Sequence, residues 1–306
     1  TTTGDRNIAI GHDALEAQTG SGCVAIGHDA MKLNTANSNT AVGAYAMDAN
    51  TTGGDNTSVG SQSLSANTTG ASNSAFGVGA MGANTTASYN SAFGASALSS
   101  CTTSQYNTSV GYESLKAITT GTGQCTAVGF RAGKSVTTGA SNVAFGSEAG
   151  ENITTGAANC ALGQGSLRNE TTGTHNVAVG TAALYTANGG SYNTAVGGQS
   201  MYYNTTGSYN VGLGYDTLQD NTTGAANCAI GHQALDKNTT GSNNIAVGRD
   251  AGSTLTTGAE NVAMGSYAFD GTTNATNCVA IGQYALSGAC GSSTVAIGDN
   301  AGFQTS

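Results

Sequence analysis

Two histidines, His12 and His28, are the side chains whose type and spacing best suit metal binding. Each is followed by an aspartate (Asp13 and Asp29), and the two pairs stand 16 residues apart. If the chain is built from stacked repeats of about this length, both imidazoles share one column with both carboxylates, and these are common zinc ligands. The same position elsewhere carries Ala, Ser, Gln or Tyr, which is typical of a solvent-facing polar column. We favour that second interpretation and expect no resident metal or other cofactor.

Other reactive side chains lack the arrangement that catalysis needs. Carboxylates do not cluster as an acid–base pair, and no nucleophile adjoins a histidine of the repeat. The chain has seven cysteines, an odd number that argues against a fully paired disulfide framework. Five of them stand at recurring strand positions, where we expect small, buried, reduced side chains: Cys23, Cys125, Cys160, Cys228 and Cys278. We therefore predict that the protein is not an enzyme.

Tyrosines form the one irregular feature of the repeats. Tyr185 and Tyr202 share a repeat position, as do Tyr192 and Tyr209, and Tyr203 extends the cluster. Exposed aromatic rings could stack on the sugars of a receptor, so these five are candidate receptor contacts. Alternatively, the rings simply stack on each other.

A repeat must position all of these residues. An apolar residue followed by Gly recurs 18 times from Gly11 to Gly298, and thirteen of the 17 spacings are 17 residues. The residue before the apolar one is Ala in 15 copies, and Asn stands four residues before the Gly in 14. Nothing interrupts the array, so we predict one continuous domain over residues 1–306, as a segment of a longer fibre protein.

The run Asn39-Thr40-Ala41-Val42-Gly43 predicts a short strand. Strands this short need neighbours, so we predict an all-β parallel β-solenoid, or β-roll, of about 18 coils with a 17-residue period and essentially no helix. The Asn column predicts a ladder of amides along the axis. Most repeats close with Thr-Thr-Gly, where we expect Gly to supply a positive φ.

Both faces of the strand carry small or apolar residues, so both should be buried. The interior of a single coil can bury only one face of the strand, so the other face needs a partner chain. Identical coils around a threefold axis would supply it, which predicts a homotrimeric fibre.

Composition excludes several classes of protein. With 47 Gly, no Pro, no Trp and 8% charged residues, the chain cannot build an ordinary globular core. The net charge is −9 with no basic patch, so we expect no nucleic-acid partner. No apolar run is long enough to span a bilayer, so we expect no membrane insertion.

The runs Val24-Ala25-Ile26-Gly27-His28-Asp29-Ala30 and Asn204-Thr205-Thr206-Gly207-Ser208-Tyr209-Asn210 resemble known fibre repeats. The first is similar to the heads of trimeric autotransporter adhesins, which are left-handed parallel β-rolls of three chains. The second resembles still more closely the repeats of phage-type tail fibres. The run Val42-Gly43-Ala44-Tyr45-Ala46-Met47 also fits the hexapeptide of left-handed β-helix acyltransferases, but here it occurs once per coil instead of on every side.

These resemblances imply an extracellular structural protein. Our leading hypothesis is a shaft or spacer of a homotrimeric phage tail fibre in the virion, supporting attachment to a host-cell glycan or protein receptor. The alternative is a repeat region of a bacterial surface adhesin that itself binds host matrix or other cells. A minor alternative is an ice-binding solenoid, because Thr52 and Thr69 begin a long Thr column. Ice-binding surfaces generally use two outward Thr separated by one residue, whereas the two Thr here are adjacent and should point to opposite sides.

Overall fold

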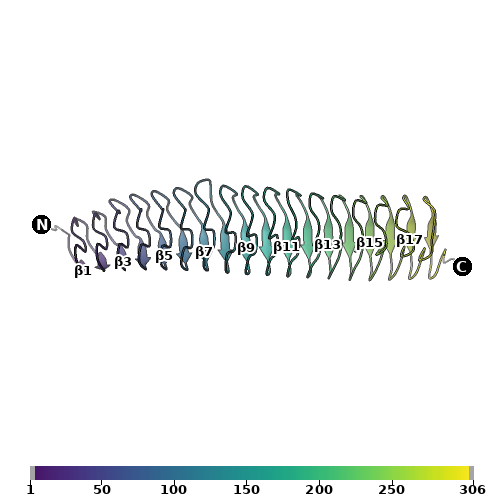
Figure 1. The fold of residues 1–306 in the computed structure, drawn as a ribbon, viewed down its shortest axis with the longest axis horizontal. Coiled ribbons are helices and arrows are strands. Elements are labelled where there is room, and N and C mark those ends of the chain that lie inside the picture. The colour runs from purple at the N-terminus through teal and green to yellow at the C-terminus, as the bar shows by residue number, and fades with distance from the viewer. Residues whose placement is uncertain (1–3, 303–306) are drawn as a thin grey trace. The chain divides into compact units, whose positions relative to one another are not determined.

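The computed structural model describes residues 4–302, and the chain divides after Thr155 into two compact units. Both units are all-β parallel solenoid with a 17-residue period, and no helix occurs among the described residues, as the repeat predicted (Figure 1). The strands of the first unit are β1 (Ile8–Ile10), β2 (Val24–Ile26), β3 (Thr40–Val42), β4 (Thr57–Val59), β5 (Ser74–Phe76), β6 (Ser91–Phe93), β7 (Thr108–Val110), β8 (Thr126–Val128) and β9 (Val143–Phe145). Those of the second are β10 (Cys160–Leu162), β11 (Val177–Val179), β12 (Thr194–Val196), β13 (Val211–Leu213), β14 (Cys228–Ile230), β15 (Ile245–Val247), β16 (Val262–Met264), β17 (Val279–Ile281) and β18 (Val295–Ile297).

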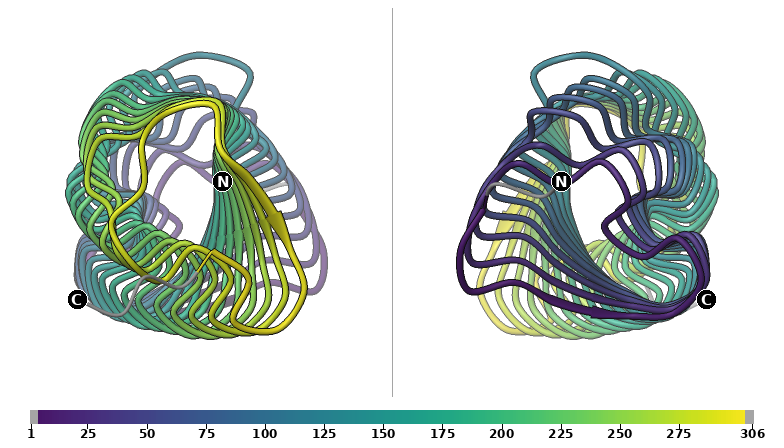
Figure 2. Two further views of the ribbon diagram at one scale, coloured as in Figure 1. Left: turned by 90° about the vertical axis from the view of Figure 1, so that its right-hand side faces the viewer. Right: turned by 90° about the vertical axis from the view of Figure 1, so that its left-hand side faces the viewer.

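Within each unit, successive strands pair in parallel and without a register shift. Thr40 of β3 lies opposite Thr57 of β4, and Val42 lies opposite Val59. The coils of a unit follow similar closed paths when viewed from their ends (Figure 2). Because the register is constant, residues at the same repeat position form a column that runs from coil to coil.

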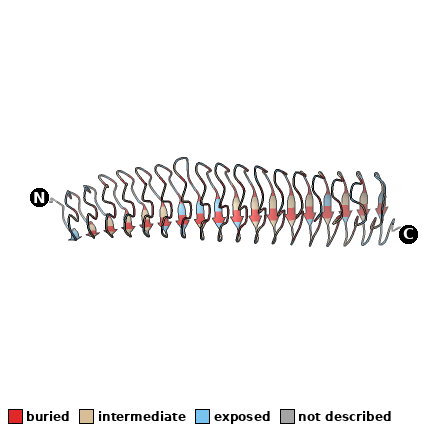
Figure 3. Cartoon of the chain, viewed as in Figure 1, coloured by how far each residue is buried: buried red, intermediate tan, exposed pale blue. Residues whose placement is uncertain are grey.

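The middle residue of each strand from β2 to β18 faces the interior of its coil. Ala41, Ala75 and Ala195 are fully buried there, whereas the first and third residues of the strands are half-buried or exposed (Figure 3). In most coils the interior is completed by a Leu or Met side chain, such as Met47 or Leu64, four residues after the glycine that follows the strand. A small strand residue therefore leaves room for one large side chain per coil.

The predicted amide ladder is confirmed. Asn39, Asn56 and Asn73 are buried. The backbone N–H of Asn56 donates to the side-chain oxygen of Asn39 at 2.8 Å, and the backbone N–H of Asn73 donates to that of Asn56 at 2.9 Å. The side-chain nitrogen of Asn56 donates across the coil to the carbonyl oxygen of Gly70 at 2.9 Å. One side chain thus satisfies polar groups on neighbouring coils where water cannot reach them.

A second buried ladder lies at the position before Thr-Thr, which sequence analysis had treated only as part of a turn. Asn67 donates to the side-chain oxygen of Asn50 at 2.7 Å, and Asn84 donates to that of Asn67 at 2.7 Å. Cys101 replaces the next Asn, and the side-chain oxygen of Asn84 has no hydrogen-bond partner in the described chain. Each interruption of the ladder therefore leaves one buried acceptor unpaired, which carries a desolvation cost.

The glycine that ends each strand is required by two constraints. Gly43 has a φ of 137°, a backbone conformation that side chains with a Cβ rarely adopt. A Cβ on Gly43 would also lie 2.6 Å from the carbonyl oxygen of Gly60 in the next coil. The backbones of successive coils are therefore too close at this point for any side chain.

The expectation that the glycine of Thr-Thr-Gly has a positive φ is wrong for the described repeats except that of Gly121, whose φ is 99°. Gly53 and Gly70 do not adopt positive φ, and Ala87 and Ser104 occupy the same column. Positive φ values recur instead at the strand-end glycine, at the residues two and four positions after it, such as Tyr45 at 59°, and at the residue before the ladder Asn, such as Ser38 at 58°.

Four coils carry Gly in place of Leu, Met or Phe at the interior position, and the coil of Gly150 shows what fills the space. Met47 has a φ of 51° there, and Gly150 has a φ of 57°. In the coil of Gly150, Ile153 takes the place of a ladder Asn, and its Cδ1 would lie 2.9 Å from a Cβ on Gly150. The apolar volume has therefore moved three residues along the coil without leaving the interior.

Candidate metal centre and surface columns

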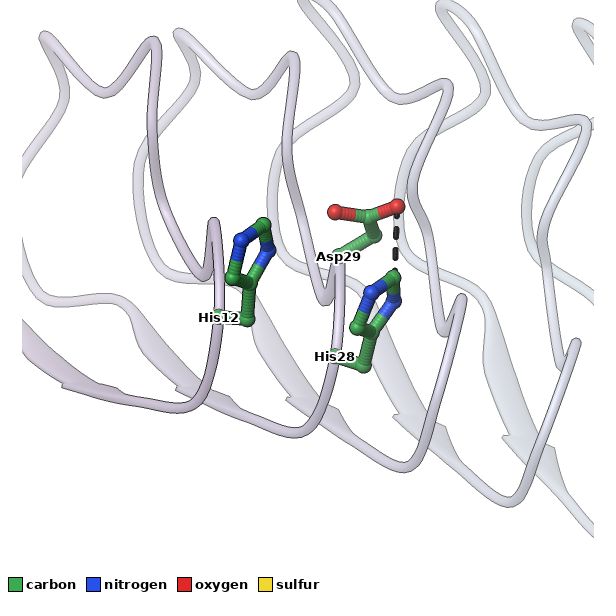
Figure 4. Close-up of side chains that lie close together, drawn as sticks. All are labelled: His12, His28 and Asp29. Carbon is green, nitrogen blue, oxygen red and sulfur yellow. Dashed lines mark ion pairs between the residues drawn. The ribbon is translucent and has the colours of Figure 1, made fainter.

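His12 and His28 occupy one column on the outer surface of the first two coils, directly after the glycines that end β1 and β2. Their rings stack with centroids 5.2 Å apart and an interplanar angle of 9° (Figure 4). The side chains are 71% and 49% exposed. In the third coil Ala44 takes the histidine position, and the next residue, Tyr45, lies 5.2 Å from His28 with its ring tilted by 57°. The predicted shared column of the two imidazoles is confirmed.

Carboxylates surround the two rings. Nδ1 of His12 is 3.4 Å from Asp13, and Nδ1 of His28 is 3.4 Å from Asp29. Lys32, which sequence analysis did not single out, places its amine 3.0 Å from Asp13 and 3.4 Å from Asp29. The hydrogen bond from Lys32 lowers the pKa of Asp13, and the same bond raises the pKa of Lys32.

His12, His28 and Asp29 can each offer a ligand atom, and these atoms all lie within 4.8 Å of one another. His232 stands in the same column but has Tyr215 as its aromatic neighbour, with centroids 5.8 Å apart. Its nearest carboxylate is Asp250 at 4.0 Å. A His–His pair therefore distinguishes the first two coils from an otherwise similar site.

The five candidate tyrosines fall into two groups. Tyr185 stacks on Tyr202 at 5.0 Å, and Tyr203 meets Tyr202 edge-on at 4.6 Å. Tyr192 stacks on Tyr209 at 5.1 Å with rings inclined by only 2°.

Parallel stacking uses the ring faces within a column and leaves the edges for other contacts. Tyr209 ends its column, because the next coil places Ala226 at that position, and Tyr209 is 63% exposed. The open face of Tyr209 is therefore a part that a sugar could stack on. Receptor contact by these residues stays a prediction.

The third residue of each strand forms an outward column, which we call the apolar stripe. It is not covered within a single chain: Phe93, Val110 and Phe145 are exposed in the first unit, and Leu162, Ile230, Met264 and Ile297 are exposed in the second. Phe76 and Phe93 stack along it at 4.8 Å. The apolar stripe is not buried inside the coil, because the Ala residues in the middle of the strands occupy the interior.

The Thr column presents one hydroxyl per coil to solvent. The hydroxyl of Thr51 donates to the carbonyl oxygen of Thr68 in the next coil at 2.9 Å, whereas Thr52 is exposed. The two adjacent threonines therefore differ in role, as the alternation of side chains predicted.

All seven cysteines are free thiols. Cys23, Cys125 and Cys278 are buried as predicted, and so is Cys101, where burial raises the pKa of the thiol to about 11. The burial expected for Cys160 and Cys228 is wrong. These two begin their strands, so their side chains point outward with the apolar stripe and are only half-buried.

Glu113 forms ion pairs with three of the basic side chains of the first unit. Glu113 lies 2.6 Å from Lys116, 3.0 Å from Lys134 and 3.2 Å from Arg131. Hydrogen bonds from Lys116 and then from Lys134 lower its pKa to about 2. This cluster links neighbouring coils on the surface.

Comparison with known proteins leaves the chain without an assigned family. No protein-family model matches it, and no curated protein matches it. Among the described residues, no helix is long and apolar enough to cross a membrane.

Proposed function

We propose that this array is a shaft or spacer of a homotrimeric, extracellular fibre of the phage-tail type, which supports host attachment and performs no catalysis. The observation that carries the proposal is the apolar stripe. Val, Ile, Phe, Leu and Met recur along it in both units, and many of them are exposed. Soluble monomeric proteins rarely expose a continuous apolar surface of this kind.

Copies of the same chain are the partners that fit the stripe best. A stripe that repeats every coil is complementary to another stripe of the same period, and identical chains in register meet this condition at every coil. Burying the remaining exposed part of one such side chain contributes about 1 kcal/mol. The resemblance of the repeats to trimeric fibres supports three chains as the number.

The uniform backbone suits a spacer. Each coil hydrogen-bonds to the coils before and after it, not only in the strands but also in the turns, where Tyr45 donates to His28 at 2.9 Å and Met47 donates to Ser63 at 3.1 Å. Stability of this kind is built from contacts between nearest neighbours. Repeating the coil therefore extends the structure without requiring a new core.

The exposed tyrosine columns favour the second candidate, an adhesin array that itself binds host matrix or other cells. Surface-immobilised protein tested against collagen, fibronectin, laminin and whole bacterial cells separates the two functions. A shaft predicts no saturable binding to any of them. Saturable binding that is lost when Tyr203 and Tyr209 are replaced by Ser would overturn the shaft in favour of the adhesin.

A further inference from the structure

We propose that His12, His28 and Asp29 form a binding site for a divalent transition-metal ion of the zinc class, which joins the first two coils. Two imidazole nitrogens and a carboxylate oxygen are the donor set that zinc takes at sites where a coordination position is left for water. All three potential ligand atoms already lie within 4.8 Å of one another (Figure 4).

The two rings need only a local movement to bind one ion. Metal–nitrogen distances of about 2.0–2.1 Å bring the ligand atoms of a tetrahedral site to roughly 3.4 Å from one another. The stacked rings direct their nitrogens in parallel, so each must rotate about its side-chain bonds to face a common point. At 71% and 49% exposure, both side chains have solvent around them in which to do so.

Asp29 supplies a more fixed ligand than the histidines. Its side chain is only 16% exposed, and its backbone N–H donates to the carbonyl oxygen of His12 at 2.9 Å. That hydrogen bond fixes the spacing of the two coils at the position where the ion binds. An ion held by residues of both coils therefore strengthens a contact that the backbone already makes.

The local charge favours a dication. Asp13, Glu16 and Asp29 all lie within 4.0 Å of the amine of Lys32, at 3.0, 3.7 and 3.4 Å. Three carboxylates thus share a single cation, which leaves an excess of negative charge at the column. The Asp29 oxygen that faces His28 is Oδ2, whereas Lys32 contacts Oδ1, so an ion bound at Oδ2 leaves the contact with Lys32 in place.

Isothermal titration of the full chain with ZnCl2 tests the site. Wild-type protein is expected to bind one Zn²⁺ per chain in a step that is lost or weakened at least about tenfold in His12→Ala and in His28→Ala, because even outer-shell changes alter metal affinity by about 10–100-fold. His232→Ala is the matched control, because it removes a histidine from the same column that has no histidine neighbour. This variant should bind like wild type. Mg²⁺ should not replace Zn²⁺, since it prefers oxygen ligands and retains its waters.

Hydrogen exchange gives a second measurement that does not depend on the heat signal. Zn²⁺ should slow exchange of the Asp29 amide in wild type and in His232→Ala but not in His28→Ala. Both column histidines are exposed, so circular dichroism should show the same fold in all variants without metal. Zn²⁺ binding that persists unchanged in His12→Ala and His28→Ala, as binding to the half-buried thiols would, overturns the proposal. Absence of saturable binding to the wild type overturns it as well.

Discussion

Replacing Gly214 by Ala should destabilise the second unit strongly, although it adds only a methyl group. Gly214 ends β13 with a φ of 138°. A Cβ there would lie 2.5 Å from the carbonyl oxygen of Gly231 and 2.8 Å from its carbonyl carbon. Backbone strain contributes about 1–3 kcal/mol and overpacking a similar amount, so we expect a loss of about 2–6 kcal/mol.

Gly198→Ala is the matched control, because this glycine lies one coil earlier and its φ is not positive. A Cβ on Gly198 meets the ring of Tyr215 at 3.4 Å and the carbonyl oxygen of Thr181 at 4.0 Å, which are ordinary contacts. Removing a flexible glycine at such a position is neutral or stabilising by up to about 1 kcal/mol. Gly214→Ala should therefore lower Tm by about 5 °C or more, whereas Gly198→Ala should leave Tm unchanged or raise it. Thermal unfolding followed by circular dichroism measures both shifts. Equal shifts in the two variants would refute the close approach of successive coils.

Three further predictions concern charge, the amide ladder and the apolar stripe. The pKa of Glu113 falls from 4.5 to about 2 on folding. The ionised carboxylate therefore stabilises the fold fully above pH 4.5, and this contribution is lost as pH falls through 2. Glu113→Gln should accordingly lower Tm more at pH 6 than at pH 2.5. Asn73→Ala leaves the backbone N–H of Asn90 without its partner, at about 1–3 kcal/mol, while the side-chain oxygen of Asn56 keeps the backbone N–H of residue 73; the variant should speed amide exchange in the adjacent coils. Val196→Asp should dissociate a trimer, because three unpaired carboxylates would be buried together at several kcal/mol each.

Each of these three has an outcome that would contradict it. A Tm difference for Glu113→Gln that is independent of pH would remove the ion pairs as its cause. Amide hydrogen exchange that is unchanged in Asn73→Ala would mean that water replaces the hydrogen bonds of the ladder. A single-chain solenoid tolerates Val196→Asp, because Val196 is only half-buried in one chain, and unchanged association in this variant would contradict the proposed interface.

The period, the strands and the first amide ladder could be predicted from the sequence because each is a column of one residue type at a constant spacing. The second ladder was missed, since Asn50-Thr51-Thr52-Gly53 looks like a turn. Its burial had one signal in the sequence: Ile118, Val136 and Ile153 replace the Asn in successive coils. Apolar residues that substitute for a polar one in the same column indicate an interior position.

The sequence alone did not show which of the two apolar faces of the strand points into the coil. Ala41 and Val42 are both apolar, so the alternation of side chains alone does not say which one enters the coil. The choice depends on the interior volume, which Met47 and the Asn side chains largely fill, so that only a small residue such as Ala, Ser or Gly fits beside them. For the metal site, the sequence placed the two histidines in one column. It could not supply the position of Lys32, whose long side chain reaches back to the preceding coil.

Sedimentation equilibrium of the wild-type array tests the central claim most directly. The mass of one chain is 29.9 kDa. An apolar stripe that is buried between three copies predicts a single species at three times this mass, which persists on dilution. A stable species at the mass of one chain, under conditions where circular dichroism shows the solenoid intact, would contradict the account and leave a single-chain β-solenoid with an uncovered stripe.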